Sequence, residues 1–271
     1  MTLPRVLVPD RAVRSGWDVV PSVATLHHLC VVLRLKPGDG VLLVDKDGVA
    51  WDAVLVSGPE GSLLRVGDRS SSERVVRQAV RWTLVLALLK GDRTEWAIQK
   101  ATEAGVADVV IVVCDRSVPR PAGQDSGRRT ERLRKVAIEA TRQTGRASPP
   151  KVDLVFSVDE AMQVLAADDM LVGDSPEMSV PLPESLGLVR PRYVLDETPG
   201  TLSLAKLLAA GQSAGGAVLA VGPEGSFSDR EHALLSSVGF VRAGLGPRVL
   251  RAETAAITAV IVAQTVVGDM K

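Results

Sequence analysis

Residues 221–235 read VGPEGSFSDREHALL, a Gly-Pro-Glu-Gly turn between an apolar run and the start of a helical pattern. The apolar run, residues 217–221, has the continuous hydrophobicity of a buried strand. Ser228 and Glu231 have the spacing of a capping box, in which each side chain satisfies a backbone N–H of the first helical turn. The capping box predicts where the helix begins, but it does not account for the glycines and the proline before it.

A phosphate-binding loop is the first alternative for the turn at 222–225. A P-loop requires a lysine followed by Ser or Thr after its second glycine, and that lysine is missing here. The Gly-x-Gly-x-x-Gly fingerprint of dinucleotide-binding folds follows none of the apolar runs. Two glycines around a proline at a strand end instead predict a turn that keeps side chains away from a ligand, as at Gly222.

A second stretch, LGPRVLRAETAAITA at 245–259, again places glycine and proline after an apolar run. It adds Arg248, Arg251 and Glu253 at the start of a helix. An acidic residue in a first turn is stabilised by the helix dipole, so Glu253 alone needs no functional explanation. Two arginines beside it exceed what a helix start requires, although a structural ion pair is the alternative for each.

The rest of the chain divides into two parts with different patterns of apolar and polar residues. Residues 1 to about 70 are β-like, with two apolar runs around Asp47-Gly48 that predict a hairpin. A serine-rich segment at 68–74 is the predicted connector. From about residue 80, apolar runs alternate with helical patterns, which predicts a parallel sheet covered on both faces. The segment 253–267 is apolar nearly all round, so we expect it in the core or against a partner chain.

Composition excludes several classes of protein. The chain has 271 residues, of which 46% are hydrophobic, and its longest C-terminal apolar stretch is shorter than the roughly 20 residues of a membrane span. Two cysteines and three histidines predict neither a disulfide framework nor a metal site. We therefore expect a cytoplasmic, metal-free protein without a membrane partner.

The net charge of zero conceals an uneven distribution. Residues 116–146 carry nine Arg or Lys against three acidic residues, whereas residues 151–187 carry one Lys against eight acids. Such asymmetry within one chain indicates a charged partner, and a solvated basic helix is the alternative.

The motifs together resemble one family. LALLKGDRTEWAIQKATEAGV, IEATRQTGR, YVLDE, VGPEGSFSDRE and LGPRVLRAETA have the order and spacing of the RsmE family, the 16S ribosomal RNA uridine N3-methyltransferases of the SPOUT superfamily. The N-terminal stretch HHLCVVLRLKPGDGVLLVDKDG is similar to the PUA-like domain of that family. The resemblance covers nearly the whole chain.

The resemblance implies an α/β SPOUT domain over 73–271, with a parallel sheet and a C-terminal trefoil knot, after a small PUA-like β-barrel domain over 1–72. Three knotted loops would hold S-adenosylmethionine through main-chain groups. The residues expected to bind this cofactor are Leu195, Asp196, Glu197, Val221, Gly222, Pro223, Glu224, Gly225, Leu245, Gly246, Val249, Leu250 and Thr254.

The implied reaction is methyl transfer to N3 of one uridine in 16S ribosomal RNA. Arg251 is the first candidate, and Arg248 the second, to stabilise negative charge on the uracil. Glu253 either removes the N3 proton or orients Arg251, and the sequence leaves both alternatives open. The implied partners are the assembled small ribosomal subunit and a second copy of this chain, in a homodimer.

The expected RNA contacts come from both halves of the chain. Glu139, Arg142, Gln143 and Arg146 have an i, i+3, i+4, i+7 spacing. This spacing predicts one polar helix face that is either solvated or in contact with RNA. Few aromatic residues are present, so phosphate contacts and shape are expected to dominate recognition. The residues expected to contact RNA are Arg5, Arg34, Lys90, Arg93, Arg128, Arg129, Arg132, Arg142, Gln143 and Arg146.

The chain departs from the family pattern at two places. Ser226 stands where the family usually has a glycine, which is expected to restrict the loop without abolishing the pocket, and Val6-Leu7 replace the usual aromatics after Arg5. Two other functions stay open. A catalytically silent RNA-binding assembly factor would not bind S-adenosylmethionine, and a SPOUT ribose methyltransferase would modify a 2′-oxygen.

Overall fold

The computed structural model describes residues 3–8, 10–59, 61–71, 80–118, 120, 124–146, 148–172, 190–211 and 215–270. The chain divides into two compact units, Met1–Arg77 with Ile138–Pro149 and Gln78–Ala137 with Pro150–Lys271. The predicted boundary between residues 72 and 73 lies outside the described residues and stays a prediction. Within the described ranges, no helix combines the length and the apolar character needed to cross a membrane.

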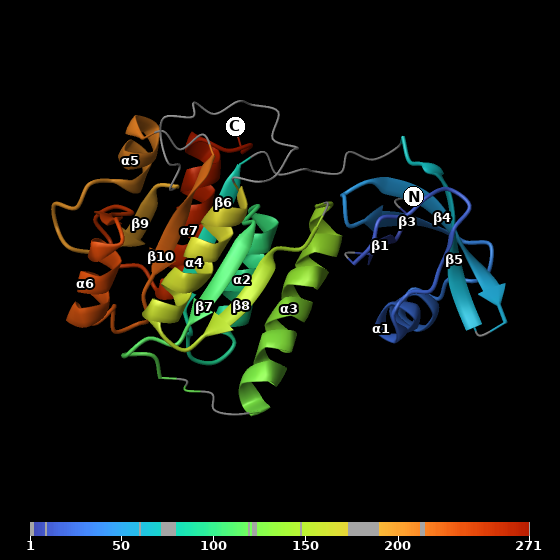
Figure 1. The fold of residues 1–271 in the computed structure, drawn as a ribbon, viewed down its shortest axis with the longest axis horizontal. Coiled ribbons are helices and arrows are strands. Elements are labelled where there is room, and N and C mark those ends of the chain that lie inside the picture. Colours follow the sequence, from blue (N-terminus) through green and yellow to red (C-terminus); the bar gives the residue numbers. More distant parts are fainter. Residues whose placement is uncertain are drawn as a thin grey trace. The chain divides into compact units, whose positions relative to one another are not determined.

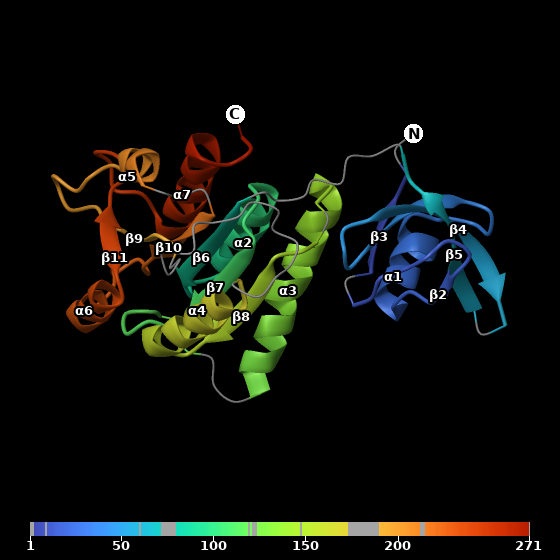
Figure 2. The same cartoon turned by 45° about the horizontal axis from the view of Figure 1, so that its top comes forward.

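The first unit contains a mixed five-stranded sheet in the order β1-β3-β4-β5-β2 (Figures 1 and 2). The predicted hairpin is confirmed, because β3 and β4 pair antiparallel on either side of Asp47-Gly48. Asp45 accepts hydrogen bonds from the amides of Asp47 and Val49 and from the Trp51 indole, which fixes this turn. Its elements are β1 (Arg5–Val8), β2 (Asp18–Val19), α1 (Val23–His27), a short π-helix η1 (His28–Val32), β3 (Gly40–Asp45), β4 (Ala50–Gly58) and β5 (Gly61–Arg69).

The second unit contains a six-stranded sheet in the order β11-β9-β10-β6-β7-β8. Every neighbouring pair in it is parallel, as the alternation of strands and helices predicted. The strands are β6 (Arg81–Ala87), β7 (Asp108–Val112), β8 (Lys151–Val155), β9 (Arg192–Leu195), β10 (Gly216–Val221) and β11 (Phe240–Ala243). The helices are α2 (Arg93–Glu103), α3 (Gln124–Thr144), α4 (Val158–Val172), α5 (Leu204–Ala210), α6 (Asp229–Ser237) and α7 (Ala252–Val266), and α3 passes from this unit into the first at residue 138.

Helices cover the parallel sheet on both faces (Figures 1 and 2). Alternate residues of a strand point to opposite faces, so Leu84 and Leu86 pack with α2, α5 and α7, whereas Val85 and Ala87 pack with α4 and α6. The two central strands, β10 and β6, are buried over almost their whole length. This burial explains why their sequences are continuous apolar runs.

The two strands at the edges of the sheet, β8 and β11, do not appear among the apolar runs of the sequence. Each exposes part of its length, as the exposed Val241 in β11 shows, and each mixes charged with apolar residues. An edge strand has a neighbour on one side only, so it needs no continuous apolar run. Helix α4 follows β8 and went unpredicted with it.

Three loops meet at the carboxyl edge of the second sheet, because β9, β10 and β11 are parallel neighbours. Main-chain hydrogen bonds connect the loop after β9 with the loop after β11. The Asp196 amide donates to the Ala243 carbonyl at 3.0 Å, and the Gly244 amide donates to the Leu202 carbonyl at 2.8 Å. The Leu204 amide in turn donates to the Gly244 carbonyl at 2.9 Å. Residue 244 is therefore held by the segment at the end of the β9–α5 loop.

Candidate functional site

A cavity of about 300 Å³ opens where these three loops meet. Its walls are mostly apolar or glycine, with charged residues from each loop. It is lined by Leu195, Asp196, Glu197, Val221, Gly222, Pro223, Glu224, Ser226, Leu245, Gly246, Arg248, Val249, Leu250, Arg251, Ala252 and Ala255. Of the residues predicted to bind cofactor, the structure brings all but Gly225 and Thr254 to this cavity. We call it the three-loop cavity.

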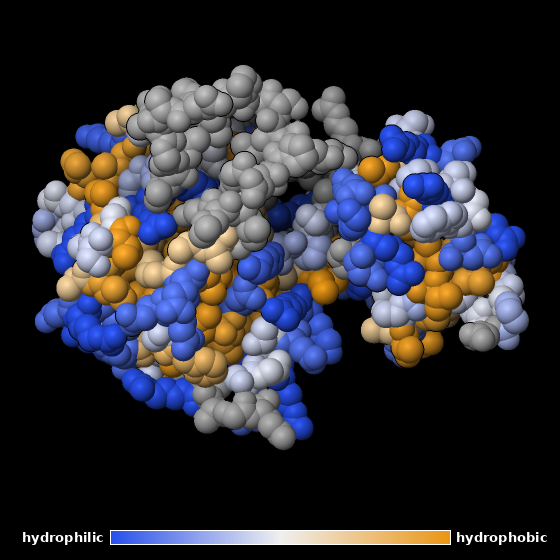
Figure 3. Space-filling view, in the orientation of Figure 1, coloured by the Kyte–Doolittle hydropathy of each residue, from blue (hydrophilic) through white to orange (hydrophobic). Residues whose placement is uncertain are grey.

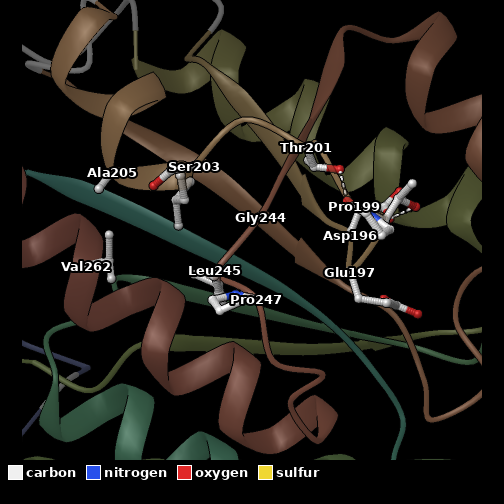
Figure 4. A pocket seen from close by; sticks show the side chains of 14 residues that line it. Asp196, Glu197, Pro199, Thr201, Ser203, Ala205, Gly244, Leu245, Pro247 and Val262 are labelled. Carbon is white, nitrogen blue, oxygen red and sulfur yellow. Dashed lines mark hydrogen bonds between the residues drawn. The ribbon is translucent and has the colours of Figure 1, made fainter.

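A second cavity, of about 470 Å³, adjoins the first and shares Asp196, Glu197, Leu245 and Gly246 with it. Figure 4 shows this second cavity, with Val262 of α7 and Ala205 of α5 on one side of Gly244 and with Asp196 and Glu197 on the other. Sequence reasoning missed it, because half of its lining residues lie between 198 and 205, at the end of the β9–α5 loop and the start of α5, where the sequence has no recognisable motif.

Gly222 is required by the packing of the loop itself. A Cβ atom on Gly222 would lie 3.0 Å from the Phe227 nitrogen and 3.1 Å from its ring, and Phe227 is buried. The expectation that Gly222 keeps bulk away from a ligand is therefore wrong, because the missing side chain faces Phe227. Gly246 has the predicted property instead, since its φ is +117° and a Cβ there would meet nothing within 4 Å.

The Gly222–Gly225 loop is held from the neighbouring β7–α3 connection. Arg116 Nη1 donates to the Gly225 carbonyl at 2.9 Å and lies 3.3 Å from the Phe227 carbonyl. The predicted capping box is confirmed, because Ser228 Oγ accepts from the Glu231 amide and Glu231 accepts from the Ser228 amide. Glu231 also accepts from the Asp115 amide at 2.9 Å, so one buried carboxylate serves two loops.

Ser226 has a φ of +59°, in the left-handed region that favours glycine. The family pattern places a glycine here, and the structure shows the reason. A side chain with a Cβ atom costs roughly 1–2 kcal/mol in this conformation. Ser226 therefore holds a strained backbone conformation, and it lines the three-loop cavity.

The Asp196 carboxylate is hydrogen-bonded and ion-paired to neighbouring residues of the protein. Burial alone would raise the pKa of Asp196, but hydrogen bonds from the hydroxyl and amide of Thr198 and the nearby Arg242 guanidinium hold that pKa below its ordinary value. Arg242 Nη1 lies 2.9 Å from Asp196 Oδ2. The ionised carboxylate thus stabilises the β9–α5 loop, and its contribution to a ligand comes mainly from its main chain.

Arg248 and Arg251 line the three-loop cavity with exposed side chains. Among the described residues, neither guanidinium forms a hydrogen bond or an ion pair, so the structural ion pair considered for each is absent there. Arg251 occupies the N-cap position of α7 without capping it through its side chain. Two cations are therefore available at the mouth of the cavity.

Glu253 is placed differently from Arg251. Its side chain is 10% exposed, and its Oε1 lies 3.8 Å from Nε of Arg93, which also donates to Glu224 Oε1 at 3.0 Å. The alternative in which Glu253 orients Arg251 is therefore wrong for this structure, because the pairing is with Arg93. Glu253 does not line the three-loop cavity within the described part of the chain.

The predicted RNA contacts in the first unit have mixed surroundings. Arg34 and Gln143 are exposed, and Arg5 packs against Gly145. Arg142 is held by Glu139 at 3.1 Å, and Arg146 is 8% exposed. The predicted single polar face is wrong at Arg146, because α3 ends at Thr144 and the chain turns inward.

The predicted RNA contacts in the second unit are more accessible. Lys90 and Arg128 are exposed, Arg129 is half-buried, and Arg132 pairs with Glu95 at 2.8 Å while 68% of its side chain is exposed. Hydrophilic side chains gather where the lower part of α3 lies (Figure 3).

No group of three or more His, Cys, Asp or Glu side chains in the described ranges has the arrangement of a metal site. Cys114 is buried, and burial raises the pKa of its thiol well above the usual range.

Comparison with known proteins gives two matches to domain families. Residues 76–264 match an RNA methyltransferase domain, and residues 23–66 match an RNA methyltransferase PUA domain. The chain is 33% identical over 232 residues to ribosomal RNA small subunit methyltransferase E of Mycobacterium tuberculosis (strain CDC 1551 / Oshkosh), a match that covers 86% of this chain and 80% of the relative. It is 28% identical over 246 residues to the protein of the same name from Bacillus subtilis (strain 168), covering 86% and 84%.

Solved structures are similar over the whole length. The crystal structure of a ribosomal RNA small subunit methyltransferase E from Neisseria gonorrhoeae, bound to S-adenosyl methionine, matches with a TM-score of 0.79 and 25% identity. The match covers 99% of this chain and 100% of that one. The similarity includes both units of the chain.

Replacement of Ser226 by glycine tests the strain in the loop. Ser226→Gly should raise the free energy of unfolding by roughly 0.5–1 kcal/mol, because relief of the left-handed strain exceeds the added entropy of the unfolded chain. Ser226→Ala is the matched control, since it removes the hydroxyl and keeps Cβ, and it should give no gain. Urea unfolding measures both, and equal stability of the two variants would contradict the strain.

Proposed function

Because the chain belongs to the RNA methyltransferase family of ribosomal RNA small subunit methyltransferase E, we propose that it methylates N3 of one uridine in 16S ribosomal RNA. Methylation of ribosomal RNA with S-adenosylmethionine is the activity that the family supports. The finer assignment rests chiefly on one observation, the two unpaired arginines, Arg248 and Arg251, at the mouth of the three-loop cavity within the described part of the chain.

The three-loop cavity fits S-adenosylmethionine. Its volume of about 300 Å³ is at the lower end of the range for small-molecule sites. The open space at Gly246 allows a flat ring to approach the main chain, and Leu245 and Leu250 offer apolar surface to it. Glu197 places a carboxylate at the cavity, which suits a ligand that carries positive charge. When bound, the cofactor supplies a methyl group activated by its sulfonium.

The arginines supply what the uracil requires. The N3–H of uridine is a weakly acidic imide, and negative charge develops on the flanking carbonyl oxygens as its proton leaves. A guanidinium directed at those oxygens stabilises the charge and also orients the ring. Arg251 is the first candidate, since it stands at the N-cap of α7, where the backbone N–H groups of the first turn add to the positive potential. Arg248 is the second.

Glu253 is a weaker candidate for the proton acceptor than the sequence indicated. It is buried behind the cavity wall and paired with Arg93, so it has no direct path to a uracil in the cavity. We therefore assign the catalytic contribution of this segment to Arg251 and assign the proton to solvent. The alternatives, a silent assembly factor and a ribose 2′-O-methyltransferase, have no observation in their favour and are outcomes of the tests below.

The substrate surface in this proposal includes the second-unit residues Lys90, Arg128, Arg129 and Arg132. Exposed arginines along a helix bind phosphates without reading sequence, which fits recognition of a folded RNA by shape. The proposed substrate is the assembled small ribosomal subunit, and the proposed location is therefore the cytoplasm.

We include the knot and the homodimer in the proposal. The hydrogen bonds that hold Gly244 between Leu202 and Leu204 support threading of the chain through the β9–α5 loop. An uncovered face of α7 supports a second copy of the chain. This face carries Thr254, Ile257, Thr258, Ile261 and Thr265.

Arg251 is expected to act in the transition state. Arg251→Ala should lower kcat roughly 100- to 1,000-fold and change the affinity for S-adenosylmethionine much less. Arg251→Lys should restore only part of the rate, since an ammonium cannot bridge two acceptors as a planar guanidinium does. Arg230→Ala, which removes an exposed ion pair with Asp159, is the control and should keep the wild-type kcat.

Mass spectrometry of nucleosides from treated small subunits identifies the product. The expected product is N3-methyluridine at a single position. Detection of 2′-O-methyluridine, or of no methylated uridine, would contradict the proposed function.

Charge reversal on α3 tests the RNA surface. The triple variant Arg128→Glu, Arg129→Glu and Arg132→Glu should bind the RNA more weakly, and its affinity should depend less on salt, by roughly 0.7–0.9 in log–log slope for each phosphate that the variant no longer neutralises. The affinity for S-adenosylmethionine should be unchanged. Binding curves at several salt concentrations measure the slope, and a slope equal to that of the wild type would mean that this segment is solvated.

Ile261→Asp tests the homodimer. The side chain is 43% exposed, so an aspartate there is compatible with the folded monomer but would be buried in a dimer that uses α7. Light scattering should show a dimer for the wild type and a monomer for this variant. Val241→Asp on β11, with 49% exposure, is the matched control and should remain dimeric. A monomeric wild type would refute the assignment.

A further inference from the structure

Arg93 connects three segments that lie far apart in the sequence. It is the first residue of α2, and its Nη1 donates to Glu224 Oε1 at 3.0 Å across 131 positions of the chain. Its Nε lies 3.8 Å from Glu253 Oε1. Glu224 belongs to the Gly222–Gly225 loop and Glu253 to the first turn of α7. One guanidinium therefore links the β10 loop and the start of α7 to α2.

The burial of Glu253 makes this link necessary. Its Oε2 is buried and has no hydrogen-bond partner, and Arg93 is the one cation within ion-pair distance among the described residues. A buried carboxylate without a countercharge is strongly destabilising, so the first turn of α7 depends on Arg93 for its position. Glu224, 35% exposed, can rotate into water, and its pairing with Arg93 restrains the loop that carries it.

Arg93 is itself outside the set of described residues that line the three-loop cavity, whereas Glu224 and the α7 residues Ala252 and Ala255 line it. Any effect of Arg93 on a ligand must therefore pass through the walls. We propose that Arg93 is a positioning residue that fixes the Gly222–Gly225 loop against the first turn of α7 and so preorganises the cavity for S-adenosylmethionine. This inference rests on the proposed function and replaces the expected RNA contact of Arg93.

A double-mutant cycle on cofactor affinity tests the inference without measuring methyl transfer. Arg93→Gln and Glu224→Gln should each weaken S-adenosylmethionine binding about tenfold, measured by calorimetry on the full chain. The double variant should bind no more weakly than either single variant, because the two residues act as one unit, and such coupling is common between residues in contact. Arg93→Lys should recover part of the affinity, since a lysine retains the charge but reaches only one carboxylate.

Lys100→Gln is the matched control. Lys100 lies on the same helix, its exposure of 35% is close to the 38% of Arg93, and it pairs with Glu103 at 2.8 Å. Its loss should leave the cofactor affinity unchanged. Thermal unfolding shows whether each variant is folded. If Arg93→Gln does not fold, the comparison of Arg93→Lys with the wild type still tests the inference.

Two results would overturn the inference. One is additivity of the Arg93→Gln and Glu224→Gln effects. The other is an unchanged cofactor affinity together with a weaker, less salt-dependent RNA affinity in Arg93→Gln, which would mean that Arg93 binds phosphate. A coupled loss of cofactor affinity in a protein that forms no N3-methyluridine would support the role of Arg93 and contradict the proposed function, so the two failures are distinguishable.

Discussion

Burial of β10 on both faces is the constraint from which the rest of the second unit follows. A strand without an exposed residue must have paired neighbours on either side and helices above and below, and β10 has β9 and β6 beside it. Gly216 begins this strand with a φ of +109°, and a Cβ there would overlap the Arg81 carbonyl oxygen, so only glycine permits the pairing with β6 at that point. Because β11, β9 and β10 are parallel neighbours, the loops that follow them leave the sheet at the same edge. The three-loop cavity forms where these loops meet.

Charged side chains near the cavity fall into two groups. Some form contacts that hold the loops in place, and others are available to contact a ligand. Asp196 is saturated by Thr198 and Arg242, and Arg116 is committed to two carbonyls of the Gly222–Gly225 loop and the residues after it. Arg248 and Arg251 make no such contacts among the described residues. The walls are thus fixed by ion pairs and main-chain hydrogen bonds behind them, while the exposed guanidinium groups of Arg248 and Arg251 remain at the opening. This division is what a site needs if it binds one ligand rigidly and admits a large second substrate.

Sequence reasoning predicted the features that local patterns encode. The continuous runs of β6, β7, β9 and β10 and the capping box of α6 follow from periodicity and local spacing, whereas the convergence of the three loops was implied by the family resemblance. It missed β8 and β11, because edge strands carry no continuous apolar run. It also misjudged Gly222, whose requirement comes from Phe227 rather than from a ligand, and it did not predict the ion pairs of Arg93 with Glu224 and Glu253. The contacts of Arg93 join residues more than a hundred positions apart, and no local spacing records them.

The same long-range link has a consequence for the order in which the molecule is made. Arg93 is synthesised early in the second unit, but its partners Glu224 and Glu253 follow much later, and Glu253 lies in the first turn of α7. Contacts between such distant segments form slowly, since the loop that closes is long. A chain that ends before α7 therefore lacks both the first turn that Arg93 pairs with and the α7 residues that line the three-loop cavity. The cofactor site is completed only when α7 has been synthesised, so a truncated translation product would lack part of the cavity wall.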